Sequence, residues 1–98
     1  MAKYRISQAA LEDLESIWLY TLKKWSRQQA SEYHKDITAE IKKIVKSEKD
    51  YGTKYFDVMS GLYCRRYRKH LIFYRFDDNG IVEIVRILHA MMDIESKF

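Results

Sequence analysis

The stretch HLIFYRFDDNGIVEIVRILH, residues 70–89, decides the fold that this sequence predicts. Two runs rich in aromatic and β-branched residues, 70–77 and 81–89, are typical of strands. The triplet Asp-Asn-Gly at 78–80 separates them, and Asn and Gly accept the positive φ angles of a tight hairpin turn. The stretch therefore predicts two antiparallel strands joined by a short turn.

Further strands are predicted on either side of this pair. The run 62–68 resembles a third strand, followed by a tight turn at 68–69. Residues 2–6 alternate in polarity, and we expect them to join the edge of the sheet. The segment 50–61 breaks the pattern and predicts a loop, whose apolar residues should pack on the body of the domain. A short turn at 91–95 is expected near the end of the sequence.

Two amphipathic helices are predicted before the sheet. Ser7 is a typical N-cap, and the 3.6-residue spacing of apolar residues predicts a helix over 7–24. Ser26 and Gln29 fit a capping box at the start of a second helix, which should end near Ser47. Because so few residues separate the helices, they should form an antiparallel hairpin that covers one face of the sheet.

Together these elements predict a single α+β domain over residues 1–98. It has an N-terminal strand, an antiparallel helical hairpin on a small curved antiparallel sheet, and a short C-terminal turn. Ninety-eight residues suffice for one core. The 14% aromatic content argues against disorder, and no apolar run is long enough for a membrane span. The single cysteine and the charged first residues favour a cytoplasmic protein.

The basic segment 63–76 is the first candidate for function, in a chain of net charge +4. It contains no acid, and tyrosines are interleaved with its cations. Those cations are Arg65, Arg66, Arg68, Lys69 and Arg75. Such a segment can grip phosphates and stack bases. It can equally be a solvated sheet face that discourages edge-to-edge association, which is the interpretation we favour.

Other chemical motifs are weak. His34, His70 and His89 lie on different predicted elements without metal-ligand spacing, so we expect no metal and no cofactor. His89 lies close in sequence to Asp93, and such a pair can transfer protons, although a structural hydrogen bond is the favoured interpretation. Cys64 lies within a predicted strand, where a thiol is usually inert.

Short pieces spread over nearly the whole chain carry a family resemblance. They include Tyr4-Arg5-Ile6-Ser7, Asp13-Leu14, Ile17-Trp18, Tyr20-Thr21, Gly61-Leu62, Ile72-Phe73-Tyr74-Arg75, Arg86-Ile87-Leu88-His89 and Met92-Asp93. Each is weak alone. In this order and spacing, they resemble the ParE branch of the ParE/RelE toxins of type II toxin–antitoxin systems.

The resemblance implies a bacterial growth inhibitor that a ParD-like antitoxin holds silent, with the antitoxin's C-terminal region wrapped along the helices and sheet. It implies DNA gyrase, through its A subunit, as the target. Such toxins interfere with the strand-breaking and rejoining cycle and are not themselves nucleases. Direct contact with nucleic acid would be secondary, and no membrane partner is expected.

RelE-like relatives instead cleave mRNA on the ribosome, which is the alternative function. Those relatives carry lysines and an arginine on the strands where this chain has Leu62, Cys64 and Leu71. The tail 93–98 has no tyrosine to serve as acid or base, so only His89 is a candidate for catalysis. We therefore expect gyrase poisoning and no enzymatic activity.

Two sets of residues are candidate binding sites under this resemblance. The first set would contact gyrase or its bound DNA: Arg65, Arg66, Arg68, Arg75, Arg86, His89, Asp93 and Phe98. The second set follows the helical apolar stripe and would meet the antitoxin, although some members must belong to the core: Leu14, Trp18, Leu22, Tyr33 and Ile37. An antitoxin rich in acids would suit the net positive charge.

Overall fold

A computed structural model describes residues 4–46 and 52–98. In chain order the elements are β1 (Tyr4–Ile6), α1 (Gln8–Lys24), α2 (Arg27–Lys46), β2 (Thr53–Lys54), β3 (Tyr63–Tyr67), β4 (His70–Phe76), β5 (Val82–His89) and the 3-10 helix η1 (Glu95–Lys97). The predicted first residues of the opening strand, the predicted helix end near Ser47 and the loop residues Asp50 and Tyr51 lie outside the described residues.

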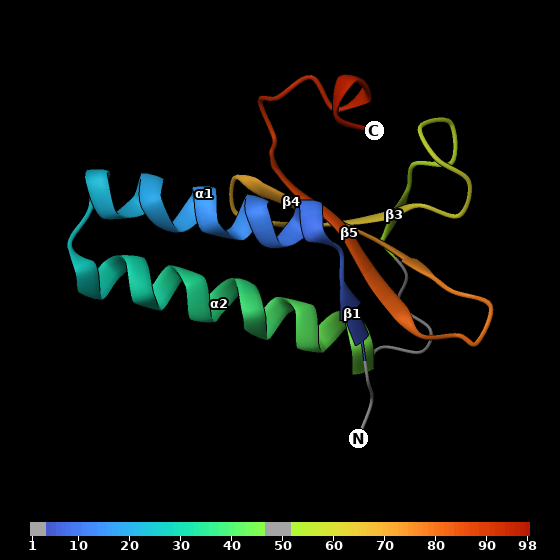
Figure 1. The fold of residues 1–98 in the computed structure, drawn as a ribbon, viewed down its shortest axis with the longest axis horizontal. Coiled ribbons are helices and arrows are strands. Elements are labelled where there is room, and N and C mark those ends of the chain that lie inside the picture. Colours follow the sequence, from blue (N-terminus) through green and yellow to red (C-terminus); the bar gives the residue numbers. More distant parts are fainter. Residues whose placement is uncertain (1–3, 47–51) are drawn as a thin grey trace.

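The sheet has five strands in the order β1-β5-β4-β3-β2, and α1 and α2 run side by side along it (Figure 1). All neighbouring strands are antiparallel except β1, which pairs with β5 in parallel. The register shifts within the β4–β5 pair, where Phe73 faces Arg86 but Tyr74 faces Ile84. Val85 is therefore an extra residue, and such bulges bend a strand. The predicted α+β fold class is confirmed.

Both helices begin as the sequence predicts. The Ser7 hydroxyl accepts a hydrogen bond from the backbone N–H of Ala10, at 3.0 Å, and so caps α1. The Ser26 hydroxyl accepts from the N–H of Gln29 at 3.1 Å, and the Gln29 side chain accepts in return from the N–H of Ser26 at 3.3 Å. This reciprocal pair is a capping box, and it satisfies donors that the first turn of a helix leaves unpaired.

One face of the sheet, called here the helix-covered face, packs against α1 and α2. Its buried residues repeat at three- or four-residue intervals on the helices and mostly alternate on the strands. They are Ala10, Leu14, Ile17, Tyr33, Ile37, Ile41, Ile44, Ile72, Tyr74, Val82, Ile84 and Ile87. This is the larger of the two cores.

The opposite face, called here the far face, carries a second core of five buried residues: Leu62, Cys64, Leu71, Phe73 and Leu88. No helix of the hairpin covers it. Apolar side chains of the 52–62 loop and the C-terminal segment pack there instead, among them Tyr55, Val58, Met59, Ile94 and Phe98. The prediction that the loop packs on the body is confirmed.

One local prediction was wrong. Thr53–Lys54 forms the short strand β2 where we expected only loop, because its backbone pairs with the edge of β3. The turn expected at 91–95 overlaps an observed turn, in which the Met92 N–H donates to the His89 carbonyl at 3.0 Å, and the 3-10 helix Glu95–Lys97 follows it. The tight turn expected at 68–69 is confirmed, and β3 ends at Tyr67, one residue before the end of the predicted run. Among the described residues no helix is long and apolar enough to cross a membrane.

Candidate functional site

The predicted basic sheet face does not exist as one surface. Arg65 points to the helix-covered side, where its Nε lies 3.0 Å from a carboxylate oxygen of Glu40 on α2. Arg66, the next residue, is exposed on the opposite side, because successive strand residues point to opposite faces. Its Nε donates to the backbone carbonyl of Arg68 at 2.6 Å. Alternation therefore divides the cations between the two sides of the sheet.

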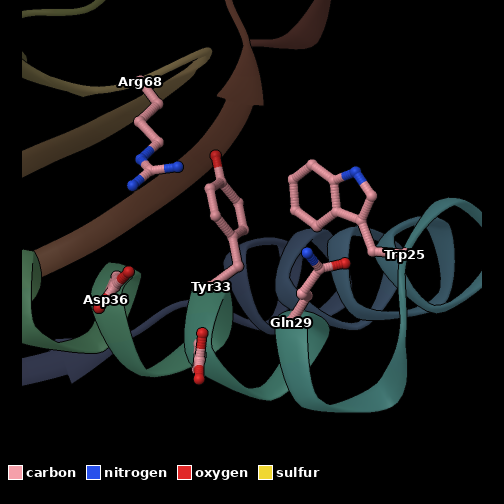
Figure 2. Close-up of a pocket in the computed structure, with 6 residues that line it drawn as sticks. Trp25, Gln29, Tyr33, Asp36 and Arg68 are labelled. Carbon is pink, nitrogen blue, oxygen red and sulfur yellow. The ribbon is translucent and has the colours of Figure 1, made fainter.

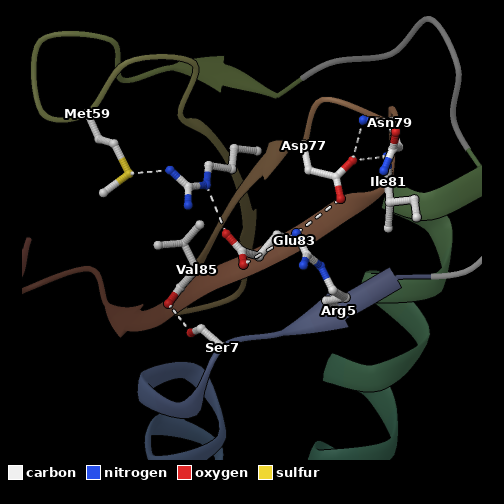
Figure 3. A network of polar contacts seen from close by, with 9 residues as sticks. Arg5, Ser7, Met59, Asp77, Asn79, Ile81, Glu83 and Val85 are labelled. Atoms are coloured by element: carbon white, nitrogen blue, oxygen red, sulfur yellow. Dashed lines mark hydrogen bonds and ion pairs between the residues drawn. The ribbon is translucent and has the colours of Figure 1, made fainter.

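Arg75 belongs to a surface network at the β4–β5 hairpin (Figure 3). Its Nε donates to Glu83 at 2.8 Å, and Arg5 of β1 lies 3.0 Å from Asp77. Hydrogen bonds from the backbone N–H groups of Ile81 and Asn79, together with Arg5, lower the pKa of Asp77. The network fastens β1 and the hairpin turn to the sheet, so Arg75 has a structural partner.

Arg86 makes three hydrogen bonds within the chain, and they hold its guanidinium in place. Its Nε and one terminal nitrogen each donate to Asp13 of α1 at 2.8 Å, and its other terminal nitrogen donates to the Lys97 carbonyl at 2.9 Å. Asp13 also accepts from the backbone N–H of Ile87 at 2.9 Å. The hydrogen bonds to Asp13 raise the pKa of Arg86. The pair ties α1, β5 and the tail together, and its charges are satisfied within the chain.

The helical candidates divide into buried and half-buried residues. Leu14, Tyr33 and Ile37 lie in the core of the helix-covered face. Leu14 and Ile37 are thus core members of the set, as the expectation allowed, whereas Tyr33 also lines the groove described below. Trp18 and Leu22 are half-buried, and the ring of Trp18 meets His34 edge-to-face at 6.0 Å between centroids.

The C-terminal candidates also differ in their exposure and in their contacts. Phe98 packs edge-to-face on Phe73 of the far face, with ring centroids 5.1 Å apart. Asp93 is exposed, and it makes no side-chain contact with His89 among the described hydrogen bonds and ion pairs. His89 instead accepts a hydrogen bond at Nδ1 from the backbone N–H of Met91, at 3.1 Å. This is a hydrogen bond of the structural kind that we favoured for this histidine.

The structure does bring one set of charged, polar and aromatic side chains together, in a groove of about 730 Å³ between the helical hairpin and the β3–β4 turn. The helices contribute Ser16, Ile17, Tyr20, Thr21, Lys24, Trp25 and Tyr33. The sheet and tail contribute Arg68, Lys69, His70, His89 and Met92. Only Arg68, His89 and Tyr33 were among our candidates. The rest were missed because the two groups are far apart in the sequence.

His70 and His89 sit opposite each other across β4 and β5 at one side of this groove. Their rings meet edge-to-face at 5.5 Å. The Tyr33 hydroxyl lies 2.6 Å from Nδ1 of His70, joining α2 to the sheet. Burial, and to a lesser degree His89, lowers the pKa of His70 to about 4. His70 is therefore a fixed and mainly neutral part of the fold near pH 7.

A smaller pocket of about 210 Å³ shares one wall with the groove (Figure 2). Arg68 reaches into it from the strand side, opposite Tyr33 and Asp36 of α2. The carboxylate of Asp36 accepts a hydrogen bond from the Tyr67 hydroxyl at 3.0 Å. Arg68 therefore lines both the groove and the smaller pocket. Its guanidinium carbon lies over the ring of Tyr67, 5.6 Å from the ring centroid.

The described residues offer little for metal or thiol chemistry. No three His, Cys, Asp or Glu side chains within them come together as a metal ion would need. Cys64 is buried in the far face, and burial raises its pKa to about 12. A nucleophilic thiol needs a lowered pKa and access to solvent, so this one is inert in the folded state.

Comparison with known proteins assigns the chain. The sequence profile of the family described as "ParE toxin of type II toxin-antitoxin system, parDE" matches residues 4–94. This chain belongs to the ParE toxin family. The curated protein Toxin ParE1 of Caulobacter vibrioides is 33% identical over 94 residues, which cover 95% of this chain and 94% of that protein. Toxin ParE1 of Mycobacterium tuberculosis is 29% identical over 96% of this chain and 95% of its own length.

A solved structure shares the ParE fold. The structure described as "Chromosomal ParDE TA system from P. aeruginosa" superposes with a TM-score of 0.75 and covers 91% of this chain and 96% of its own. Identity is only 16%, so this likeness concerns the fold alone. The family membership inferred from the short sequence pieces is confirmed.

Proposed function

We propose that this ParE-family chain inhibits bacterial growth by poisoning DNA gyrase, and that a cognate antitoxin neutralises it. In this proposal the toxin performs no bond chemistry of its own. It binds gyrase during the strand-breaking cycle and prevents rejoining, so that cleaved DNA accumulates.

The closed far face is the observation that carries the proposal. RelE-like nucleases resemble this chain in fold but carry catalytic cations where it has Leu62, Cys64 and Leu71. These three side chains are at most 9% exposed and pack beneath the loop and tail. A phosphodiester needs cations and a proton donor or acceptor at the reacting atoms, and a buried apolar cluster supplies neither.

The geometry of His89 supports the same conclusion. The Met91 N–H donates to its Nδ1, so the lone pair on this nitrogen is engaged and does not serve as a general base. A general base must reach the proton it removes through a free nitrogen. The alternative of ribosome-dependent mRNA cleavage has no better-placed residue among those described.

Contact with gyrase or its DNA is proposed for the accessible members of our candidate set. Arg65, Arg75 and Arg86 are paired with acids of this chain. Arg66 is exposed near the tip of the β3–β4 hairpin, and within the described residues no acid lies within ion-pair distance of it. A solvated guanidinium can pair bidentately with a phosphate or a carboxylate of a partner.

The test is an assay of purified gyrase with supercoiled plasmid. Wild-type toxin should increase linear, cleaved DNA, and the antitoxin encoded beside its gene should abolish the effect. Arg66→Glu should reduce the linear product at least tenfold at equal toxin concentration. Lys42→Glu makes the same change of charge at an exposed site on the other side of the molecule and should cleave like the wild type. Unchanged supercoiling and no linear DNA with active toxin would refute the proposal.

A further inference from the structure

Three cations in the groove between the helical hairpin and the β3–β4 turn have no acidic partner among the described residues. Lys24 lines the groove from the end of α1, and Arg68 and Lys69 line it from the turn. None of the three takes part in an ion pair within the part of the chain that the structure describes. No described lining residue is an Asp or Glu. The groove therefore presents positive charge from both of its sides, and such a site attracts an anionic ligand.

Two exposed aromatic rings border the same groove. Tyr20 is 61% exposed and Trp25 is 44% exposed. The Nζ of Lys24 lies over the Tyr20 ring, 5.9 Å from its centroid, so a cation and a ring are presented at adjacent points. Trp25 meets the buried ring of Tyr33 edge-to-face, with centroids 5.6 Å apart. Exposed rings beside cations are typical of surfaces on which nucleic-acid bases stack while their phosphates pair with the cations.

The groove has a firm base because that base belongs to the core. Ile17 and Tyr33 are buried there, and the Tyr33 hydroxyl lies 2.6 Å from Nδ1 of His70. The groove volume of about 730 Å³ falls within the range of about 300–1,000 Å³ that is typical of ligand sites. Bases in a duplex are stacked on one another, so only an unpaired strand offers its base faces to protein side chains. A preformed groove of this size therefore suits a few unpaired nucleotides.

We propose that this groove binds single-stranded DNA. Phosphates of the strand meet Lys24, Arg68 and Lys69, and its bases stack on Tyr20 and Trp25. The inference goes beyond the proposed function, since the contact forms with DNA itself and without gyrase. Only the choice of DNA over RNA rests on that function, in which the strand is one that gyrase has cut.

The test is fluorescence anisotropy of the purified toxin with a labelled oligothymidylate in the absence of gyrase. A length of about ten nucleotides suffices, since sites of this kind cover about 4–16. Three phosphate contacts predict that the logarithm of the association constant falls with the logarithm of salt concentration with a slope of about −2. Arg68→Gln should weaken binding about fivefold and bring this slope to about −1.4. Lys42→Gln, at an exposed lysine outside the groove, should leave the slope unchanged and the affinity within twofold.

Tyr20→Ala tests the stacking separately from the charge. It should weaken binding about fivefold or more without changing the salt slope, because it removes a ring and no cation. Tyr20→Phe keeps the ring and should bind within twofold of the wild type. Leu19→Ala, at a side chain 52% exposed on the same helix but outside the groove, is the matched control and should bind like the wild type. All these side chains are exposed, so the melting temperatures should stay close to that of the wild type.

The outcomes separate this inference from gyrase poisoning. Wild-type affinity in both Arg68→Gln and Tyr20→Ala would overturn the groove as the site. Equal competition by polyglutamate would show that the groove responds to charge alone, and equal competition by duplex DNA or tighter binding of an oligouridylate would exclude single-stranded DNA as its ligand. If the oligothymidylate binds as expected but the toxin leaves gyrase cleavage unchanged, gyrase poisoning fails and the groove stands. If cleavage rises but the oligothymidylate does not bind, the groove fails and gyrase poisoning stands.

Discussion

The two faces of the sheet are covered in different ways. On the helix-covered face, regular helices supply a continuous apolar stripe, and polar pairs such as Tyr33–His70 and Tyr67–Asp36 lie at its margin. On the far face, a loop and a tail without long elements cover a smaller apolar cluster. The first face is the framework of the fold. The second is closed by these irregular segments, and under the proposed function its closure argues against a nuclease site there.

The largest effect should come from a cavity on the helix-covered face. Ile72 is fully buried between the sheet and the helices. Ile72→Ala should reduce the free energy of unfolding by about 3 kcal/mol, because it removes buried methyl groups and leaves a void. Urea unfolding followed by circular dichroism measures this. Ile72→Val, the conservative control, should cost about 1 kcal/mol, and equal losses in both variants would contradict the packing described.

A smaller loss is expected at the link between the two faces. Asp13 accepts two hydrogen bonds from Arg86 and one from the Ile87 N–H, and Arg86 in turn donates to the tail at Lys97. Asp13→Asn leaves some of these hydrogen-bond donors unpaired and should reduce the free energy of unfolding by about 2 kcal/mol. Glu15→Gln, exposed on the same helix, should change stability by less than about 0.5 kcal/mol. The amide protons of the C-terminal tail should also exchange faster than in the wild type in Asp13→Asn, but not in Glu15→Gln.

Acid should weaken the helix-covered face selectively. The pKa of His70 is about 4 in the folded state and about 6.5 in the unfolded chain. The unfolded state therefore binds more protons between these values, and stability falls as the pH drops from about 6.5 to 4. Allowing for the partial exposure of the ring, this group should contribute about 1 kcal/mol of that loss. His70→Gln should flatten this part of the pH profile, and an unaltered profile would argue against a buried neutral histidine.

Removing the ring of Phe98 should cost little stability, but it should make the far face clearly more accessible to solvent. Phe98 packs on Phe73 and helps to cover Cys64. Phe98→Ala should cost about 1 kcal/mol, since the ring is only half-buried. The reaction of Cys64 with a thiol reagent should nevertheless accelerate about fivefold, because each 1.4 kcal/mol changes a local opening equilibrium tenfold. Met91→Ala, at a side chain 87% exposed, is the control and should leave the thiol protected.

Much of this architecture could be predicted from local patterns. The capping signals at Ser7 and Ser26, and the alternation around the Asp-Asn-Gly turn, each act within a few residues. The strand β2 could not be foreseen, because Thr53–Lys54 becomes a strand only through its pairing with β3. For a short segment with a weak local preference, pairing with a distant part of the chain therefore decides whether it forms a strand.

The candidate site was harder to predict than the fold. The alternation of side chains along a strand predicts that Arg65 and Arg66 lie on opposite faces of the sheet. Nothing in the sequence around Arg65 shows that Glu40 of α2 will form an ion pair with it. The groove joins Tyr20 to Met92, more than seventy residues apart. Residues so distant in sequence meet only in the folded chain. A site built from two such groups gives no signal in either one alone.

The central claim is that this closed ParE-family toxin acts on gyrase and cuts no RNA itself. The most direct measurement follows both outcomes in one culture after induction of the toxin without its antitoxin. DNA breaks covalently linked to gyrase are counted, and transcript ends are mapped in the same cells. The account predicts gyrase-linked breaks within the first minutes, with transcripts intact. Codon-specific cuts in messenger RNA, without trapped gyrase and lost in His89→Ala, would contradict it.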